Sequence, residues 1–430
     1  MQDDIRPSKS KKTPPNPAHQ PMRSQRLRGH NLETAKDRLN PKPVARPAAA
    51  EEAPIVLAAA EPPAKQTPIK KQRFAWWRDL NRNLRFGIIA LLLLLFATGA
   101  ILFYNHNRPA GSSFISITRH KKAAAKTVAS PLTGLQVDPA LAARPVTGIM
   151  IENSDAARPQ SGLQDAGVVY EAIAEGGVTR FLTLFQDASP QYIGPVRSLR
   201  PYYIDYAAPF QASIVHVGGS PDALAEVTDG SFRNLDQFAN GDYFTRVNSR
   251  DAPHNVYTSF SEIDQLNQSK GYTSSSYTSW PRKADKKLAT PTAKTIQLAI
   301  AGPDFYANYT YDAKTNTYLR SEGGAPHLDL VNASDTTGVQ LSPKVVIAIV
   351  VPLSSGALDA SGAYYSNYQT SGTGTAYVFQ DGGVTQGSWT KGGTNDQISF
   401  SDASGAPLKL DAGQTWITLI SGDNMVTYAP

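Results

Sequence analysis

The sequence predicts a mixed α/β fold, α+β in class: a two-domain extracytoplasmic body that follows a disordered tail and one transmembrane helix. Three observations predict it. Residues 86–104 form a charge-free apolar run, residues 144–285 alternate short apolar strands with helix-opening turns, and residues 286–430 contain a nearly uninterrupted series of strand patterns. The first body domain is expected to be a mixed sheet with helices, and the second a β-dominated domain.

Residues 1–85 are predicted to be a disordered basic tail in the cytoplasm. They contain 18 Lys and Arg against 8 Asp and Glu, so the tail carries +10 of a chain whose net charge is +6, and the remainder carries −4. Proline-rich and alanine-rich stretches leave the tail too little apolar surface to fold. The basic character therefore indicates contact with an anionic inner leaflet, excludes nucleic acid as a partner of the body, and leaves any cytoplasmic partner of the tail unknown.

The run from Phe86 to Tyr104 is predicted to span the membrane once, because about 19 uncharged residues cross a hydrocarbon core as one helix. Trp76 and Trp77 precede it and suit the interfacial belt. The cationic side chains before the span place the N-terminus in the cytoplasm and the C-terminal body outside; they are Lys70, Lys71, Arg73, Arg78, Arg82 and Arg85. The span is thus a plasma-membrane signal anchor, followed by a linker at 105–143.

The chain has no cysteine. This excludes disulfides, thiol nucleophiles, thiolate metal sites and a lipidated N-terminal cysteine. The exported body must therefore be stabilised without disulfides.

In the first domain, residues 144–285, a strand near 145–153 precedes a hairpin centred on Gly176 and Gly177. Counting outward from that turn places Ile173 opposite Arg180, with Glu171 and Glu175 as diagonal neighbours on the same face. Two carboxylates around one guanidinium form a structural ion pair or, alternatively, a catalytic acid/base pair.

Arg197 and Arg200 stand just ahead of a helix that Pro201 opens and Pro209 ends. Guanidinium groups beside unpaired backbone N–H groups suit a phosphate or a carboxylate. The alternative is internal pairing with Asp205, Glu171 or Glu175, and the sequence leaves both open.

A second turn, Gly218-Gly219-Ser220, follows a strand at 212–217 and leads into a helix that begins at Pro221. Ser220 is a candidate cap, and a strand that ends in such a turn is where open α/β sheets present ligands. Neither a Walker-type P-loop nor GxGxxG is present, so no cofactor is indicated. A further helix is expected from the Ser259 and Glu262 capping box to Gly271.

The second domain, residues 286–430, is read as strands in the runs IQLAIA, NYTYD, TYLRS, KVVIAIVV, AYVFQ, VTQGSWT and QTWITLI. Only three histidines lie in the body: His216, His254 and His327. No HExxH or close histidine pair occurs, and no GxSxG, so neither a metal site nor a serine triad is predicted. His216 remains a catalytic candidate with Glu171 and Glu175.

Several long motifs closely resemble the YerB-like family, the domain of unknown function 3048. In its N-terminal domain these are IMIENSDAARPQSGLQDAGVVYEAIAEGGVTRF, IGPVRSLRPYYIDYA, VHVGGSP and APHNVY, and in its C-terminal domain YTYDAKTNTYLR, PHLDL, GTGTAYVF, GSWTK and GQTWITLI. The resemblance covers residues 145–425 and implies a bacterial, envelope-facing protein of mixed α/β fold. Some relatives look like lipoproteins, whereas this chain offers a helix in place of the cysteine.

The motifs give candidate ligand-binding residues without giving their roles: Arg180, Arg197, Arg200, Gly218, Gly219, Ser220, His254 and Asn255. The leading hypothesis is a binding or scaffolding module that recognises an anionic envelope ligand. The alternatives are an enzyme that acts on envelope material, with Glu171 or Glu175 as acid/base, and an envelope assembly protein that binds partner proteins. Whether the protein is an enzyme is left open.

Overall fold

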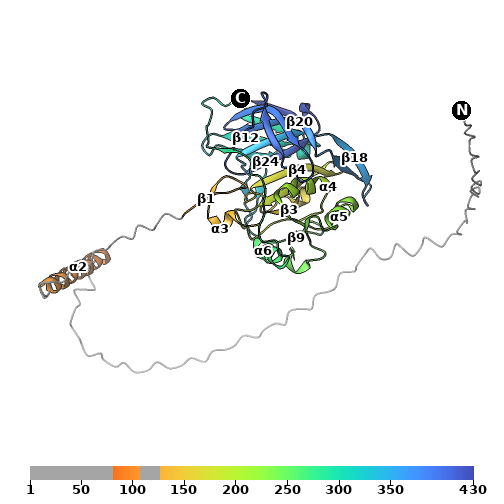
Figure 1. The fold of residues 1–430 in the computed structure, drawn as a ribbon. Helices are drawn as coiled ribbons and strands as arrows, with labels where there is room; N and C mark the ends of the chain where they lie inside the picture. Colours follow the sequence, from red (N-terminus) through yellow and green to blue (C-terminus); the bar gives the residue numbers. More distant parts are fainter. Residues whose placement is uncertain (1–80, 107–125) are drawn as a thin grey trace, which may run out of the picture. The chain divides into compact units, whose positions relative to one another are not determined.

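The structure is a computed structural model that describes residues 81–106 and 126–430. The described residues fall into two units, the helix within residues 81–106 and the body at 126–430, and each is described by itself (Figure 1). Apart from residues 81–85, the tail predicted to be disordered lies outside the described residues.

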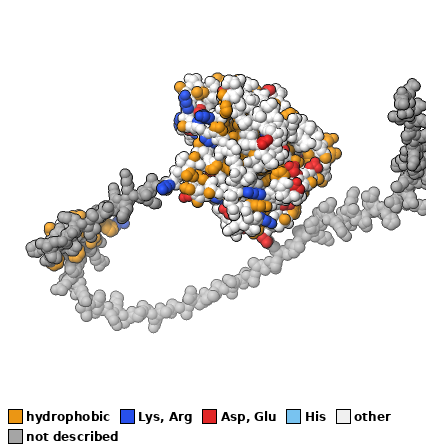
Figure 2. All heavy atoms as spheres, in the orientation of Figure 1, with side chains coloured by type: hydrophobic (Ala, Val, Ile, Leu, Met, Phe, Trp, Pro, Cys, Tyr) orange, Lys and Arg blue, Asp and Glu red, His pale blue; other side chains and the backbone are white. Residues whose placement is uncertain are grey.

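The described part of the first unit is one helix, α2 (Arg82–His106). Its window Arg82–Ala100 is the one stretch within residues 81–106 and 126–430 that is long and apolar enough to cross a membrane. Hydrophobic side chains lie exposed along it, as Figure 2 shows. The helix confirms the predicted apolar segment, and it begins four residues earlier than expected.

A central mixed sheet of twelve strands organises the second unit. Its order is β22-β21-β20-β17-β24-β4-β5-β3-β6-β7, and the β18–β19 hairpin attaches to β4 through β19. The strands are β3 (Thr147–Glu152), β4 (Val168–Glu175), β5 (Val178–Phe185), β6 (Ser213–His216), β7 (Arg233–Asp236), β17 (Val345–Val350), β18 (Leu353–Leu358), β19 (Tyr364–Tyr368), β20 (Gly372–Gln380), β21 (Gly383–Lys391), β22 (Ser399–Asp402) and β24 (Thr415–Ile420).

The sheet joins the two regions that the sequence predicts as domains. β24 pairs in parallel with β4 and also with β17, so the early and late strands form one continuous ladder. Beyond β5 the sheet continues with β3, β6 and β7, and these three strands run parallel to one another. The boundary between residues 285 and 286 as a division between folding units stays a prediction.

A smaller five-stranded sheet has the order β14-β13-β12-β11-β25. Its strands are β11 (Thr295–Leu298), β12 (Ala307–Asp312), β13 (Thr317–Glu322), β14 (Ala325–Pro326) and β25 (Val426–Ala429). Four two-stranded pairs complete the strands of residues 126–430: β1 (Val128–Ala129) with β2 (Gln136–Val137), β8 (Thr245–Arg246) with β9 (Val256–Tyr257), β10 (Arg282–Lys283) with β23 (Leu410–Asp411), and β15 (Leu328–Asp329) with β16 (Val339–Gln340).

The helices of this unit are short. They are α3 (Pro139–Ala142), α4 (Pro201–Ala207), α5 (Pro221–Val227) and α6 (Phe260–Ser269), with 3₁₀ turns η1 (Asp155–Ala157), η2 (Ala208–Phe210), η3 (Gly241–Tyr243), η4 (Pro303–Phe305) and η5 (Asp423–Met425). The predicted starts at Pro201, Pro221 and the Ser259 cap are confirmed, and the Ser259 hydroxyl accepts the Glu262 N–H.

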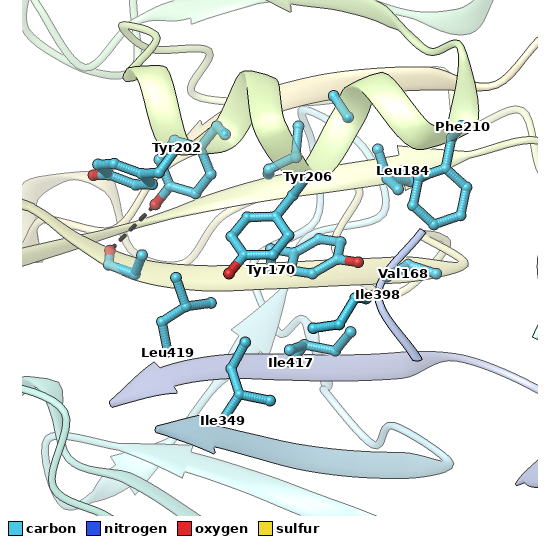
Figure 3. Close-up of a cluster of buried hydrophobic side chains, with 14 of the residues drawn as sticks. Val168, Tyr170, Leu184, Tyr202, Tyr206, Phe210, Ile349, Ile398, Ile417 and Leu419 are labelled. Atoms are coloured by element: carbon cyan, nitrogen blue, oxygen red, sulfur yellow. Dashed lines mark hydrogen bonds between the residues drawn. The ribbon is translucent and has the colours of Figure 1, made fainter. Parts of the chain in front are cut away.

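Apolar side chains fill both faces of the central sheet. Helices α4 and α5 cover one face, where Tyr170 of β4 stacks on Tyr206 of α4 (Figure 3). On the other face, α6 packs over the β3–β5 part through Phe260 and Ile263, and the five-stranded sheet packs over β17 and β20. The central sheet is therefore buried on both sides, which explains the nearly continuous apolar runs of its strands.

Residues 128–143 differ from the predicted linker, because they form β1, β2 and α3. Leu132 between the two strands belongs to the main core. The side chains of Ser130 and Thr133 donate to Asp187, just after β5. Residues 128–143 therefore pack against the body and form part of it, ahead of β3 in the chain.

Candidate functional site

The candidate site lies at the carboxyl ends of the parallel strands β3, β6 and β7, where open α/β sheets present ligands. An extended segment that contains Arg197 lies between the ends of β3 and β6 and forms backbone hydrogen bonds on both sides. The Arg197 N–H donates to Met150 O at 2.9 Å, and Arg197 O accepts from Val217 N at 3.0 Å. The backbone of Arg197 is therefore fixed by the sheet on both sides.

A buried carboxylate, Glu152 at the end of β3, holds the side chains of Arg197 and His254. Glu152 Oε2 lies 3.3 Å from Arg197 Nε, and its two oxygens lie 2.9 and 3.0 Å from His254 Nδ1. The Glu152 side chain is 5% exposed, whereas those of Arg197 and His254 are 23% and 24% exposed. Ser154 adds a hydroxyl donor to Glu152 Oε1 at 2.9 Å.

Glu152 contacts only the inner nitrogens of its two partners. Arg197 Nε is held as an ion pair and not as a hydrogen bond, and within the described part of the chain no hydrogen bond engages Arg197 Nη1 or Nη2, or His254 Nε2. Burial lowers the pKa of Arg197, partly offset by Glu152, but the guanidinium stays charged far above neutral pH. The outer nitrogens, Arg197 Nη1 and Nη2 and His254 Nε2, are therefore available to contact a ligand.

Arg200 is not an open ligand-binding side chain. It stands at the N-cap of α4, and its Nη2 and Nε donate to Glu175 Oε2 at 2.5 and 3.1 Å. Its guanidinium lies 4.8 Å from the ring centre of Tyr365, and its side chain is 5% exposed. Of the two readings for this arginine, internal pairing with Glu175 is the one that the structure shows.

Arg180 shares the same carboxylate. Its Nη2 donates to Glu175 Oε1 at 2.6 Å, and its Nη1 donates to Ser198 O at 2.9 Å. Burial raises the pKa of Glu175, but Arg180 and Arg200 outweigh burial and lower it. A carboxylate bracketed by two guanidinium groups stays ionised and makes a poor general acid.

The predicted register of the β4–β5 hairpin is wrong. Gly176 and Gly177 both have positive φ, as expected for the turn, but a β-bulge lies between Ile173 and Glu175, so Arg180 pairs with Ala172 and not with Ile173. The extra residue moves the Glu175 side chain to the other face of the sheet.

Because of this bulge, Glu171 and Glu175 do not form a pair. Glu171 is fully buried on the opposite face, where it accepts from Arg320 Nη2 at 2.8 Å, from Trp416 Nε1 at 2.9 Å and from Thr418 Oγ1 at 3.2 Å. Glu171 has no exposed surface, and both of its oxygens accept hydrogen bonds from buried side chains, which is the geometry of a structural ion pair.

His216 is also enclosed. It has no exposed surface, its Nδ1 lies 2.8 Å from Gly218 O, and its Nε2 lies 2.9 Å from Asn234 Oδ1. With both ring nitrogens occupied, it fastens the end of β6 to β7 and presents nothing to a ligand.

The turn after β6 is built from residues that pack closely. Gly218 has φ +59, and its N–H donates to Asp236 Oδ1 at 3.0 Å, while a Cβ on Gly219 would lie 3.1 Å from Leu199 O. Ser220 precedes α5 but makes no side-chain cap hydrogen bond, which corrects that prediction. Asn255 turns toward Arg246 Nη1, 2.8 Å from its Oδ1.

Sequence reasoning missed the residue that organises the site, Glu152, and a second polar network behind it. In that network Glu322 accepts from Asn153 Nδ2 at 2.6 Å and from Arg158 Nη2 at 3.2 Å. A hollow of about 330 Å³ opens beside Arg158 and Glu322, between η1 and the β13–β14 turn. The one local signal for Glu152 is an ionisable residue that directly follows the apolar run IMI.

The described residues contain no group of three or more His, Asp or Glu side chains placed to hold a metal ion.

Comparisons with known proteins identify the family. The model "Protein of unknown function (DUF3048) N-terminal domain" matches residues 132–273, and the corresponding C-terminal domain model matches residues 296–417. The Bacillus subtilis (strain 168) protein named "Putative lipoprotein YerB" is 32% identical over 302 residues, which cover 69% of this chain and 87% of that protein. The chain therefore belongs to the DUF3048 (YerB-like) family, as its motifs predicted.

A solved structure agrees with this fold. The crystal structure of YerB protein from Bacillus subtilis superposes with a TM-score of 0.61 at 27% identity, covering 70% of this chain and all of that chain. The matched family is one of unknown function.

Proposed function

We propose that this protein is a membrane-anchored extracytoplasmic binding protein that recognises an anionic ligand of the cell envelope through Arg197 and His254. The observation that carries the proposal is that the buried Glu152 contacts Arg197 Nε and His254 Nδ1, while both side chains stay partly exposed and their outer nitrogens have no hydrogen-bond partner in the described part of the chain. Those donors suit an oxyanion, and the guanidinium suits bidentate binding of a phosphate or carboxylate.

The proposed location rests on α2 and on the relative. A helix with the length and composition to span a bilayer supports a single-pass anchor with the N-terminus in the cytoplasm and the body outside. The name of the Bacillus subtilis relative, "Putative lipoprotein YerB", supports the same side of the membrane for the shared body. The two anchors would hold the body at the outer surface of the plasma membrane by different means.

The binding proposal is tested with the full chain in detergent micelles, with inorganic phosphate and citrate as probes. Isothermal titration should detect binding that Arg197→Gln weakens about tenfold or more, the scale of one lost charge-assisted contact. Arg233→Gln is the matched control, because Arg233 is also partly buried with a pKa lowered by burial, but it lies at the amino end of β7. Equal affinities of wild type and Arg197→Gln would remove the proposal.

One observation favours an enzyme as the second candidate. In the Glu152–His254 pair, a carboxylate engages Nδ1 and leaves Nε2 open, which is how a carboxylate orients a general-base imidazole. This would move the acid/base role from Glu171 and Glu175 to His254. Turnover of p-nitrophenyl phosphate or p-nitrophenyl acetate that disappears in His254→Gln would support it.

The third candidate, an assembly protein that binds partner proteins, makes the opposite prediction. Substitutions of Arg197 and His254 would then leave its envelope function unchanged in a complementation assay, because the interaction surface would lie elsewhere.

A further inference from the structure

A second cluster of reactive groups lies away from the proposed binding site, where β10 meets β23. Lys283 of β10 and Asp411 of β23 are Cα partners in a parallel pairing, so their side chains leave neighbouring strands toward the same side. Asp381, in the turn between β20 and β21, reaches the same point.

The Lys283 ammonium contacts both carboxylates. Its Nζ touches Asp411 Oδ1 and lies 2.5 Å from Asp381 Oδ2. The Asp411 side chain is fully buried, and its Oδ2 has no hydrogen-bond partner in the described part of the chain. A buried carboxyl group with one unsatisfied oxygen costs free energy, because the protein does not replace the water that the oxygen has lost.

Asp381 is held in position by contacts on its other oxygen. Its Oδ1 accepts from Asn316 Nδ2 and from the Lys286 N–H, each at 2.9 Å, so Oδ2 stays directed at Lys283. The buried Tyr311 in turn donates to Asn316 Oδ1 at 2.6 Å. The amine, the buried carboxyl and the second carboxyl therefore have fixed positions relative to one another.

An ordinary lysine pair in the same unit shows the difference. Lys344 lies 2.5 Å from Asp285, but that carboxylate is 46% exposed, and among the described residues no second carboxylate contacts the amine. Such a pair is a solvated ion pair of small net energy.

We propose that Lys283 and Asp411 form an intramolecular amide bond, with Asp381 as the proton-transfer group. Nζ of the neutral amine attacks Cγ of the Asp411 carboxylic acid, the new C–N bond forms, and the C–OH bond breaks. Asp381 takes the proton from Nζ and delivers it to the departing hydroxyl, which leaves as water, so that no oxidant, cofactor or further reactant is consumed.

The protonation states of the cluster are compatible with a slow, single event. Burial raises the pKa of Asp411 to about 6, which keeps part of it in the acid form that the reaction needs. Burial lowers the pKa of Lys283, but contacts with the two aspartates outweigh it and raise the pKa, so the resting amine is an ammonium ion. The reaction therefore waits for proton transfer within the cluster and need occur only once per molecule.

The amide bond would give a body without cysteine the covalent link that a disulfide gives other exported proteins. It would link β10, which lies between the two regions that match the family's domain models, to β23, which lies near the end of the second region. A link over so long a loop restricts the unfolded chain strongly.

The test is the intact mass of the full chain, purified in detergent and measured under denaturing conditions. The wild type should be lighter than its sequence by about 18 Da, one water. Lys283→Arg should have the full sequence mass, since a guanidinium keeps the charge but is a poor nucleophile. Lys344→Arg, the matched control, should keep the deficit, and Asp381→Asn should show a reduced modified fraction.

Peptide mapping identifies the bond that causes the deficit. Digestion should give a branched species that joins the peptides containing Lys283 and Asp411. A wild type of full sequence mass would overturn the proposal. So would a deficit confined to a linear peptide containing Asp381-Gly382, which would indicate a cyclic imide at that dipeptide. Because the bond can form only in the folded chain, each variant is first shown by circular dichroism to fold as the wild type does; a variant that folds like the wild type and keeps the deficit without Lys283 would also overturn the proposal.

Discussion

Replacing Glu171 by glutamine tests whether this residue is structural, as the geometry indicates, or catalytic. The carboxylate uses Oε1 for Arg320 and Oε2 for Trp416 and Thr418, and Glu171 and Arg320 are both fully buried. Glutamine has the same shape but only one accepting oxygen. Its NH₂ group must therefore face either the Arg320 or the Trp416 donor.

The magnitude follows from the charge left behind. Removing one partner of a buried ion pair costs about 3–5 kcal/mol, and Arg320 keeps partial compensation from Glu322 Oε2 at 3.4 Å. We therefore expect Glu171→Gln to lower the free energy of unfolding by about 3 kcal/mol, the lower end of that range. For a unit of this size, the Tm should fall by roughly 5–10 °C.

The assay is urea denaturation of the full chain in detergent, followed by circular dichroism. The matched control is Glu226→Gln, because Glu226 is only partly buried and makes no hydrogen bond within the described residues. Its unfolding free energy should change by less than about 0.5 kcal/mol. If Glu171→Gln were as stable as the control, the buried network would not carry the stability that we assign to it.

Three further predictions concern packing and pH. Glu175→Gln leaves two buried arginines short of an anion and should destabilise the body by about 3 kcal/mol in the same urea assay; a loss below about 1 kcal/mol would contradict the bracketing role of this carboxylate. In Gly387→Ala the new Cβ would lie 1.9 Å from Ser401 O, so β22 should detach from β21 and its backbone amides should exchange faster with deuterium. The control is Gly302→Ala, whose Cβ would meet nothing within 4 Å, and its amides should exchange at the wild-type rate. Burial raises the pKa of Glu322 from 4.5 to about 7, so the folded state holds this proton more tightly than the unfolded chain, and its contribution to stability is full below pH 4.5 and is lost as pH rises through 7. Glu322→Gln should make this decline in Tm shallower, and an unchanged pH profile would refute the assignment.

Local patterns predicted the elements well, because each depends on residues close together in the chain. Pro221 opens α5, the Ser259 cap opens α6, and Gly176-Gly177 make the hairpin turn, each where propensity and positive φ require it. Apolar alternation likewise found the strands at the centre of the large sheet and β11, β12 and β13 of the smaller one, but not the edge strands β7, β22, β14 and β25 or the β18–β19 hairpin.

The partners of the charged residues could not be predicted in the same way. Counting from the hairpin turn assumed an unbroken ladder, and one bulge residue sends Glu175 to the face opposite Glu171. Arg320 pairs with Glu171 across 149 positions of sequence, and no local period encodes such a contact. Leu132 looked like linker because its burial depends on a core assembled mostly from later residues.

The charges at the end of β3 favour an anionic ligand over a cationic one. Arg180, Arg197 and Arg200 carry three positive charges, and Glu152 and Glu175 carry two negative charges. Arg180 and Arg200 are buried, and the single Glu175 carboxylate must serve both, so one of the three positive charges has no negative partner in this cluster. Leaving such a charge without a partner in a partly desolvated site is costly. An oxyanion on the outer nitrogens of Arg197 would neutralise the cluster, whereas a cation would add to the excess.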